Sequence, residues 1–298
     1  MHLPVRLVAI DMDGTLLPTN SHAISPRNAQ ALLAAQQAGI TVVIATGRRV
    51  AYTTPLLHPI GLRADTPLIA SNGAVTRQLN GTHLGRSHMP AHVARGLCGI
   101  LRPFGAVVFT FDRDGRGELV LEDIDQAHGR IALWIESNRD AIEIVKPLED
   151  AIRDDEDPIQ GMVAGTVDHM RRAEAALKAS HLASACACVR TEYPARDISI
   201  LDLLPHGVSK ATALESLAAS LGIDRKETMA IGDNWNDAEM LEWVAQPIVM
   251  ANASAELRAH AKTRGWRQTA RNDEDGVALA LESAIAKRRK SNLEEGAA

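Results

Sequence analysis

A short apolar run near the start of the chain, Val5–Ile10, constrains the fold more than any other feature, and it stops abruptly at Asp11–Thr15. Apart from Arg6, the run consists of small or branched aliphatic residues. Such a run is typical of a strand that is buried on both faces of a parallel sheet. The polar sequence Asp-Met-Asp-Gly-Thr is then expected at the carboxyl end of that strand.

Strand and helix patterns alternate after this first strand. A helix is expected from Pro26, with Ser25 as its N-cap and Gly39 at its end, and buried strands are expected at Ile40–Ala45 and Pro67–Ala70. Strand, helix and strand at this spacing are typical of parallel βαβ units. The predicted fold class is therefore α/β, with a Rossmann-like, doubly wound parallel sheet as the core.

The same alternation returns near the end of the chain. A helix is expected at Ser209–Leu221, and buried strands are expected at Thr228–Ile231 and Pro247–Met250. The charged residues from Lys287 onward are expected to fray, as chain ends commonly do.

The middle of the chain has shorter segments and more charge. Strand patterns occur at Ala106–Phe111, Glu118–Leu121, Ala185–Thr191 and Ile198–Leu203, and helical patterns at Ala91–Leu101 and His169–Ala179. The chain has 298 residues, and a single core rarely grows past roughly 250–300. We therefore expect a core formed by residues 1–85 and 206–298, with an α+β domain inserted at residues 86–205.

Charge and hydropathy argue against several kinds of partner. The formal net charge of −5 gives no reason to expect nucleic-acid binding. No apolar run approaches the roughly 18–20 residues that span a bilayer, and Met1–Arg6 lack the layout of a signal peptide. We therefore expect a cytoplasmic protein with no membrane partner. The three cysteines show no zinc-ligand spacing and are expected to be buried or half-buried.

Polar side chains follow four of the expected core strands. Ligands of open parallel sheets bind beyond the carboxyl ends of the strands, so clusters far apart in sequence are expected to meet in one pocket. These clusters are Asp11 with Asp13, Thr46, Ser71 with Asn72, and Asp233 with Asn236 and Asp237.

The carboxylates of this pocket would repel one another, and a divalent cation is the natural compensation. Carboxylate oxygens suit Mg²⁺, which also keeps several waters and a substrate phosphate. Together with Lys210, such an ion would neutralise and position a phosphoryl dianion. A single aspartate at a strand end is more often a turn former or a helix cap. The combination of these residues, in this order, favours the chemistry of phosphate esters.

Four motifs resemble the haloacid dehalogenase superfamily of phosphohydrolases, in particular its Cof-like branch. In chain order they are Asp11–Thr15, Ile44–Arg48, Gly207–Lys210 and Gly232–Asp237. Ser71–Gly73 and Asn272–Val277 also look like that branch. The resemblance covers the core and is weak across the insert, which lies where this branch carries a large α/β cap. It implies a catalytic core and a cap that selects the substrate.

The resemblance also implies a role for each core residue. Asp11 would be the nucleophile that forms an aspartyl-phosphate, and Asp13 would be the general acid and base. The phosphoryl group would be bound by Thr46, Gly47 and Lys210, and Asn236 would either contact the phosphate or orient Lys210. Mg²⁺ would be held by the carboxylate of Asp11, the backbone carbonyl of Asp13 and Asp233. Asp237 would support the metal through water. Separately from the resemblance, Arg48 directly follows the threonine motif and is expected as a supporting residue that either reaches the substrate or the cap, or pairs with a nearby carboxylate.

Three functions remain open at this stage. The first is a Mg²⁺-dependent phosphatase for small monoesters such as a sugar phosphate, a nucleotide or a phosphorylated cofactor. The second is a phosphomutase that uses the same aspartyl-phosphate, and the third is a phosphate-ester-binding regulatory protein without turnover. No motif names the substrate or the oligomeric state. Trp235 is bulkier than the family pattern leads us to expect, and it either packs beneath its loop or narrows the pocket mouth.

Overall fold

The computed structural model describes residues 3–18, 21, 23–125, 129–153, 157–193 and 196–295. The chain divides into two compact units. One consists of Met1–Gly85 together with Ser209–Ala298, and the other of Arg86–Val208. We call the first the core unit and the second the insert unit.

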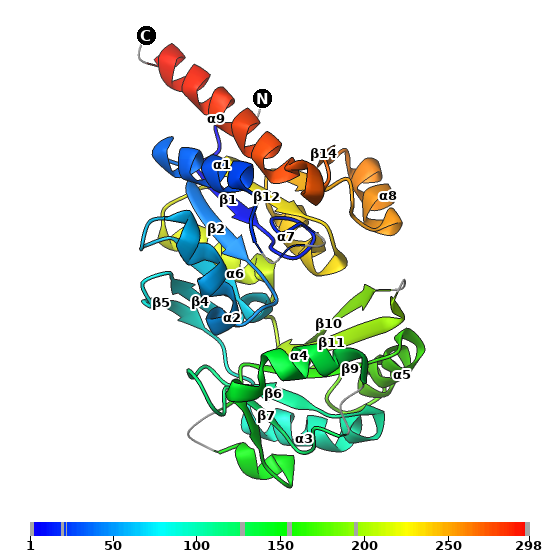
Figure 1. The fold of residues 1–298 in the computed structure, drawn as a ribbon. Helices are drawn as coiled ribbons and strands as arrows, with labels where there is room; N and C mark the ends of the chain where they lie inside the picture. Colours follow the sequence, from blue (N-terminus) through cyan, green and yellow to red (C-terminus); the bar gives the residue numbers. More distant parts are fainter. Residues whose placement is uncertain are drawn as a thin grey trace. The chain divides into compact units, whose positions relative to one another are not determined.

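Among the described residues, the core unit contains an eight-stranded sheet in the order β14-β13-β12-β1-β2-β3-β4-β5 (Figure 1). Its strands are β1 (Leu7–Ile10), β2 (Thr41–Ala45), β3 (Pro67–Ala70), β4 (Val75–Gln78), β5 (His83–Arg86), β12 (Thr228–Gly232), β13 (Gln246–Val249) and β14 (Arg267–Gln268). The strands from β14 to β3 run parallel to their neighbours, whereas β4 pairs antiparallel with β3.

Helices pack on both faces of this sheet, which confirms the predicted doubly wound α/β fold. They are α1 (Pro26–Gln37), α2 (Val50–Leu57), α6 (Lys210–Ser220), α7 (Ala238–Trp243), α8 (Ala255–Arg264) and α9 (Gly276–Glu295). Side chains of β1 alternate between the faces. Val8 and Ile10 pack with α1 and α9, whereas Leu7 and Ala9 pack with α6, α7 and α8.

The sequence predicts the start of α1 correctly, but it does not predict where α9 ends. Helix α1 begins as predicted, with Pro26 in its first position after the N-cap Ser25. The fraying predicted from Lys287 onward is wrong, because α9 continues to Glu295. Arg288 explains the difference: its side chain donates to two backbone carbonyls of neighbouring segments, those of Ala38 at 2.9 Å and Val5 at 3.0 Å.

The insert unit has a sheet of its own, with six strands among the described residues in the order β10-β11-β9-β6-β7-β8. These are β6 (Val108–Thr110), β7 (Leu119–Leu121), β8 (Ile142–Ile144), β9 (Gln160–Gly165), β10 (Cys186–Tyr193) and β11 (Ile198–Pro205). Its helices are α3 (Ala91–Leu101), α4 (Ala132–Ser137) and α5 (Val167–Lys178). Helices α3 and α5 pack with Phe109 and Phe111, and α4 packs with Val108 and Leu119 in a separate cluster.

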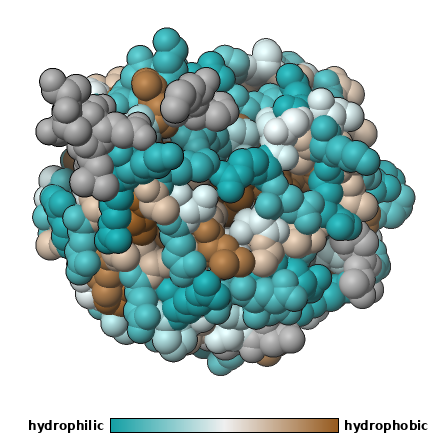
Figure 2. Space-filling view, turned by 90° about the horizontal axis from the view of Figure 1, so that it is seen from above, coloured by the Kyte–Doolittle hydropathy of each residue, from teal (hydrophilic) through white to brown (hydrophobic). Residues whose placement is uncertain are grey.

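The surface shows no broad apolar area in the view of Figure 2. Hydrophilic residues cover most of that face, and the hydrophobic residues on it lie in small, separate patches. Of the helices in the described part of the chain, none has the length and apolar character that a membrane crossing requires.

Candidate active site

The register of the central strands brings the predicted polar clusters to one level. Ile10 of β1 pairs with Ile231 of β12 on one side and with Ile44 of β2 on the other. The N–H of Asp11 continues this ladder by donating to the carbonyl of Ile231 at 3.0 Å. The chain therefore leaves neighbouring strands at the same edge, with Asp11 and Thr46 at adjacent strand ends.

Lys210 joins two of the carboxylates at this edge. It is the first residue of α6, whose N-cap Ser209 accepts a hydrogen bond from the N–H of Thr212. Its Nζ donates to Oδ1 of Asp11 at 2.6 Å and to Oδ1 of Asp237 at 2.7 Å. Lys210 is 1% exposed, Asp11 4% and Asp237 0%. The ammonium group is thus a buried, fixed positive charge within the site.

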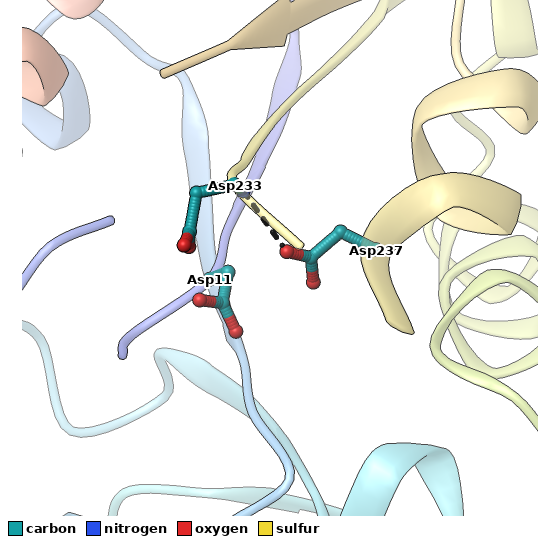
Figure 3. A group of neighbouring side chains, drawn as sticks. All are labelled: Asp11, Asp233 and Asp237. Carbon is teal, nitrogen blue, oxygen red and sulfur yellow. Dashed lines mark hydrogen bonds between the residues drawn. The ribbon is translucent and has the colours of Figure 1, made fainter. Parts of the chain in front are cut away.

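The loop after β12 holds Asp233 and Asp237 in a fixed relation. Oδ2 of Asp237 accepts the N–H groups of Asp233 and Asn234, each at 3.1 Å. Gly232 permits this tight turn, because a Cβ there would lie 2.7 Å from the Cβ of Asp237. The side chain of Asp233 consequently points toward Asp11, as Figure 3 shows.

The loop after β1 contacts the same group of carboxylates. The hydroxyl of Thr15 donates to Oδ1 of Asp233 at 2.8 Å. Gly14 has a φ of +83°, and a Cβ on it would lie 2.3 Å from Oδ2 of Asp233. A side chain at this position would be strained and would also clash with Asp233, which explains the glycine in the Asp-Met-Asp-Gly-Thr motif.

Three carboxylates share this space with the ammonium group of Lys210. Oxygen atoms of Asp11, Asp233 and Asp237 all lie within 4.8 Å of one another. Burial raises the pKa of Asp11 well above its ordinary value, and the charge of Asp237 raises it further although Lys210 opposes both. Burial and Asp237 also raise the pKa of Asp233 to about 7. Burial alone would lower the pKa of Lys210, but Asp11 and Asp237 outweigh it and raise that pKa.

This donor set fits a hard divalent cation. Carboxylate oxygens are the ligands that Mg²⁺ prefers, and its charge would offset the excess of negative charge. Both oxygens of Asp237 already accept hydrogen bonds, so Asp11 and Asp233 are better placed to bind an ion directly. In the same loop, Oδ1 of Asn236 is buried and accepts no hydrogen bond from the described residues. It can therefore accept one from a bound ligand or from a metal-bound water.

Asp13 is paired with Arg48 rather than grouped with Asp11, Asp233 and Asp237, of which Asp11 and Asp237 are buried and Asp233 is half-buried. Two parallel hydrogen bonds join them, from Nε to Oδ2 at 2.7 Å and from Nη2 to Oδ1 at 2.5 Å. The guanidinium also lies over the ring of Tyr52, 5.0 Å from its centroid. Of the two predicted alternatives for Arg48, the structure shows the pair with a carboxylate. The side chain of Asp13 remains 46% exposed and accessible to a ligand.

Thr46 and Gly47 form a tight turn after β2. Thr46 is fully buried, and its hydroxyl oxygen accepts the N–H of Arg48 at 3.1 Å. The turn packs closely on the next one, because a Cβ on Gly47 would lie 3.1 Å from Oδ1 of Asn72. Ser71 and Asn72 have φ values of +48° and +53°, so this second turn is itself in a restricted conformation. Phosphate binding by Thr46 and Gly47 stays a prediction.

Two residues of the site are not identified by sequence reasoning. The bond of Thr15 to Asp233 cannot be read from the spacing of the motifs, although Thr15 belongs to one of them. Asn252 lies outside every motif, yet its Nδ2 donates to the carbonyl of Gly14 at 2.7 Å. Only the three-dimensional arrangement connects these residues to the loops after β1 and β12.

Trp235 lies at the surface of the loop after β12. It is 41% exposed, and its ring centroid is 5.7 Å from that of His260 in α8. Its Nε1 donates to Glu256 of the same helix at 3.3 Å. The bulky ring therefore packs against α8.

Known proteins match this chain along most of its length. Residues 8–281 match the family model of haloacid dehalogenase-like hydrolases. Phosphatase YwpJ of Bacillus subtilis is 28% identical, with 92% of this chain and 98% of that protein covered. HMP-PP phosphatase of Escherichia fergusonii is 30% identical, with 85% and 87% covered.

Solved structures lead to the same family. A haloacid dehalogenase-like hydrolase from Bacteroides thetaiotaomicron has a TM-score of 0.76 and 25% sequence identity, and the match covers 94% of this chain and 99% of the other. The chain belongs to the haloacid dehalogenase-like hydrolase family. This membership confirms the resemblance drawn from the motifs, and with it the predicted enzyme class, a phosphoric monoester hydrolase.

Proposed function

We propose that the protein is a Mg²⁺-dependent phosphatase that hydrolyses small phosphate monoesters through an aspartyl-phosphate on Asp11. The observation that carries the proposal is the buried ion pair between Asp11 and Lys210, 2.6 Å long, within the group of three carboxylates. Because Lys210 occupies Oδ1 of Asp11, Oδ2 is the oxygen left to attack phosphorus. Relatives that are named phosphatases support the same class of reaction.

In the first step, Oδ2 of Asp11 attacks the phosphorus atom and the bond to the leaving-group oxygen breaks. Lys210 is held beside Asp11 and stabilises charge on the phosphoryl oxygens, with Thr46 as a further contact. Asp13 donates a proton to the departing oxygen. A bound Mg²⁺ would supply further neutralisation of the phosphoryl charge, and Asp11, the carbonyl of Asp13 and Asp233 would hold it.

In the second step, a water molecule attacks the phosphorus atom of the aspartyl-phosphate. Asp13, now deprotonated, takes a proton from that water. The bond between phosphorus and Asp11 breaks, which releases inorganic phosphate and restores the carboxylate. In both steps one oxygen of Asp13 must leave its hydrogen bond with Arg48 to reach the reacting atoms.

The substrate class we infer is a small phosphorylated metabolite: a sugar phosphate, a nucleotide or a phosphorylated cofactor. The relative from Escherichia fergusonii is named for HMP-PP, a small phosphorylated compound, which supports this size class. The net charge of −5 is unfavourable for nucleic-acid substrates. Selection among small substrates is assigned in this proposal to the insert unit.

The proposed function is tested by phosphate release from p-nitrophenyl phosphate and from a panel of phosphorylated metabolites. We expect release to require Mg²⁺ and to stop when EDTA removes the metal. Sugar phosphates should yield free phosphate and no isomer. Formation of an isomer would indicate a phosphomutase, and tight ester binding without turnover under every metal condition would indicate a regulatory protein.

The metal-free protein is expected to lose stability as the pH rises toward neutrality. The pKa of Asp233 is about 7 in the folded protein against an ordinary value of 3.8. Between these values the folded state holds a proton that the unfolded state lacks, so the free energy of unfolding falls with rising pH.

Binding of Mg²⁺ requires the deprotonated carboxylates, so stabilisation by the ion should grow over the same pH window. We expect about 5 mM Mg²⁺ to raise Tm more at about pH 8 than at about pH 6, measured against Na⁺ at equal ionic strength. The same Tm shift at both pH values would argue against Asp233 as a ligand.

A further inference from the structure

The loop that carries Asp13 is held from outside by two asparagine side chains. Asn252 follows β13, and Asn272 begins a 3-10 turn before α9. Nδ2 of Asn252 donates to the carbonyl of Gly14 at 2.7 Å, and Nδ2 of Asn272 donates to the carbonyl of Leu17 at 2.8 Å. Two carbonyls of this loop are therefore fixed by residues that come 238 and 255 positions later in the chain.

A third hydrogen bond joins the two asparagines. The backbone N–H of Asn272 donates to Oδ1 of Asn252 at 2.9 Å. Because a backbone N–H can only donate, this end of the Asn252 amide must be the oxygen, and the other end is the donor that faces Gly14. Asn272 therefore sets the orientation of the Asn252 amide, and at 1% exposed it does so away from solvent.

The segment that contains Asn272 is itself firmly placed. Asp275 has a φ of +56° and accepts a hydrogen bond from the hydroxyl of Ser25 at 2.5 Å. Gly276 lies so close to Ala270 that a Cβ on it would be 2.3 Å from that carbonyl oxygen. These contacts explain the Asn272–Val277 motif as an anchor, whereas the catalytic roles assigned above leave it unused.

A small displacement of Gly14 would also displace the neighbouring residues Asp13 and Thr15, which belong to the proposed reaction site. Gly14 links Asp13 to Thr15, and the hydroxyl of Thr15 binds Asp233. Its φ of +83° and its close approach to Asp233 mean that even a small change in its backbone would alter the contact between the two loops. If the Gly14 carbonyl were released, the peptide group between Gly14 and Thr15 could rotate. Because Asp13 directly precedes Gly14, its side chain would then shift as well.

We propose that Asn252 is a positioning residue, which fixes the Gly14 carbonyl and thereby the carboxylate of Asp13, and that Asn272 keeps the Asn252 amide oriented. This inference rests on the proposed function, in which Asp13 transfers the proton. A hydrogen bond that only stabilises the fold would change the free energy of unfolding alone. A positioning bond lowers kcat while KM changes little, because the substrate still binds.

Two variants of Asn252 and one control distinguish a positioning role from a role in stability alone. Asn252→Asp keeps the shape and the acceptor for Asn272 but cannot donate to Gly14, whereas Asn252→Ala removes the whole amide. Gln246→Ala is the matched control. Gln246 is 8% exposed, and its side-chain Nε2 donates to the carbonyl of Leu3 at 3.1 Å, at the amino end of β13 and thus at the opposite edge of the sheet.

Both Asn252 variants are expected to lower kcat for p-nitrophenyl phosphate by roughly 10- to 100-fold, because a misplacement of about 1 Å can cost that much. KM should stay within about 3-fold of its wild-type value. Gln246→Ala should keep the wild-type kcat at a similar loss of stability in urea. Hydrogen exchange of the N–H groups of Leu16 and Leu17 should be faster in the Asn252 variants than in Gln246→Ala.

The proposal is overturned if Asn252→Ala keeps the wild-type kcat, or loses no more of it than Gln246→Ala. The proposed function itself fails if wild-type protein releases no phosphate under any metal condition. Hydrogen exchange then still decides the positioning claim. Unchanged exchange at Leu16 and Leu17 in the Asn252 variants would show that the amide does not hold the loop.

Discussion

Asp11→Asn is expected to reduce phosphate release by at least about 10³-fold, because a neutral amide oxygen cannot replace the attacking carboxylate. The fold should persist, since Lys210 can still donate to the amide oxygen. Burial and Asp237 raise the pKa of Asp11, so its charge destabilises the metal-free folded protein at neutral pH. The variant should therefore be more stable than wild-type protein when Mg²⁺ is absent.

Two measurements separate lost chemistry from lost structure in this variant. Phosphate release is followed under single-turnover conditions, and the free energy of unfolding is followed in urea with and without Mg²⁺. Asp65→Asn is the control, because Asp65 is an exposed carboxylate paired with Arg63 at 2.5 Å. The control should match wild-type protein in activity. Residual activity of Asp11→Asn above about 1% would rule out Asp11 as the nucleophile.

Lys210→Met is expected to show the second large effect, in both stability and rate. The substitution leaves the carboxylates of Asp11 and Asp237 buried without the ammonium group that now binds both. Breaking a buried ion pair from one side typically costs about 3–5 kcal/mol, so we expect a loss of that size in metal-free protein at neutral pH. Phosphate release should fall by about 10²–10³-fold, since a donor to the phosphoryl oxygens is lost.

Added Mg²⁺ should restore part of the stability of Lys210→Met but little of its activity. The ion would neutralise the carboxylates of Asp11 and Asp237, but it cannot replace the hydrogen-bond donor that Lys210 supplies to the phosphoryl oxygens. Urea unfolding with and without Mg²⁺ measures this recovery. Lys262→Met, at an exposed site of α8, is the control and should change neither quantity. A loss of less than about 1 kcal/mol in metal-free Lys210→Met would show that the buried pairs contribute little.

The core fold follows from local patterns in the sequence, and the structure confirms it for that reason. Runs such as Val5–Ile10 are typical of buried strands, and polar residues at their carboxyl ends lie at one edge of the sheet when the strands are parallel. The orientation of side chains does not follow from such patterns. Arg48 forms an ion pair with Asp13, and Lys210 forms ion pairs with Asp11 and Asp237. These pairs depend on distances in space that the spacing of residues along the chain does not determine.

Long-range contacts account for the remaining differences. The end of α9 reads as a charged tail, but Arg288 fixes it through carbonyls of Ala38 and Val5, far away in sequence. Asn252 likewise has no local signal, because its function depends on Gly14 and Asn272. A single asparagine between two helices or strands is usually a turn residue, so its role becomes visible only when its partners are placed.

The covalent aspartyl-phosphate is the central claim, and trapping it tests that claim most directly. Protein is quenched with acid during turnover and treated with borohydride, which reduces an aspartyl-phosphate to homoserine. Trypsin cleavage after Arg6 and Arg27 gives one peptide that contains both Asp11 and Asp13. We predict homoserine at position 11 and unchanged aspartate at position 13. Homoserine at position 13, or none at all while phosphate is being released, would contradict the assignment of Asp11 as the nucleophile.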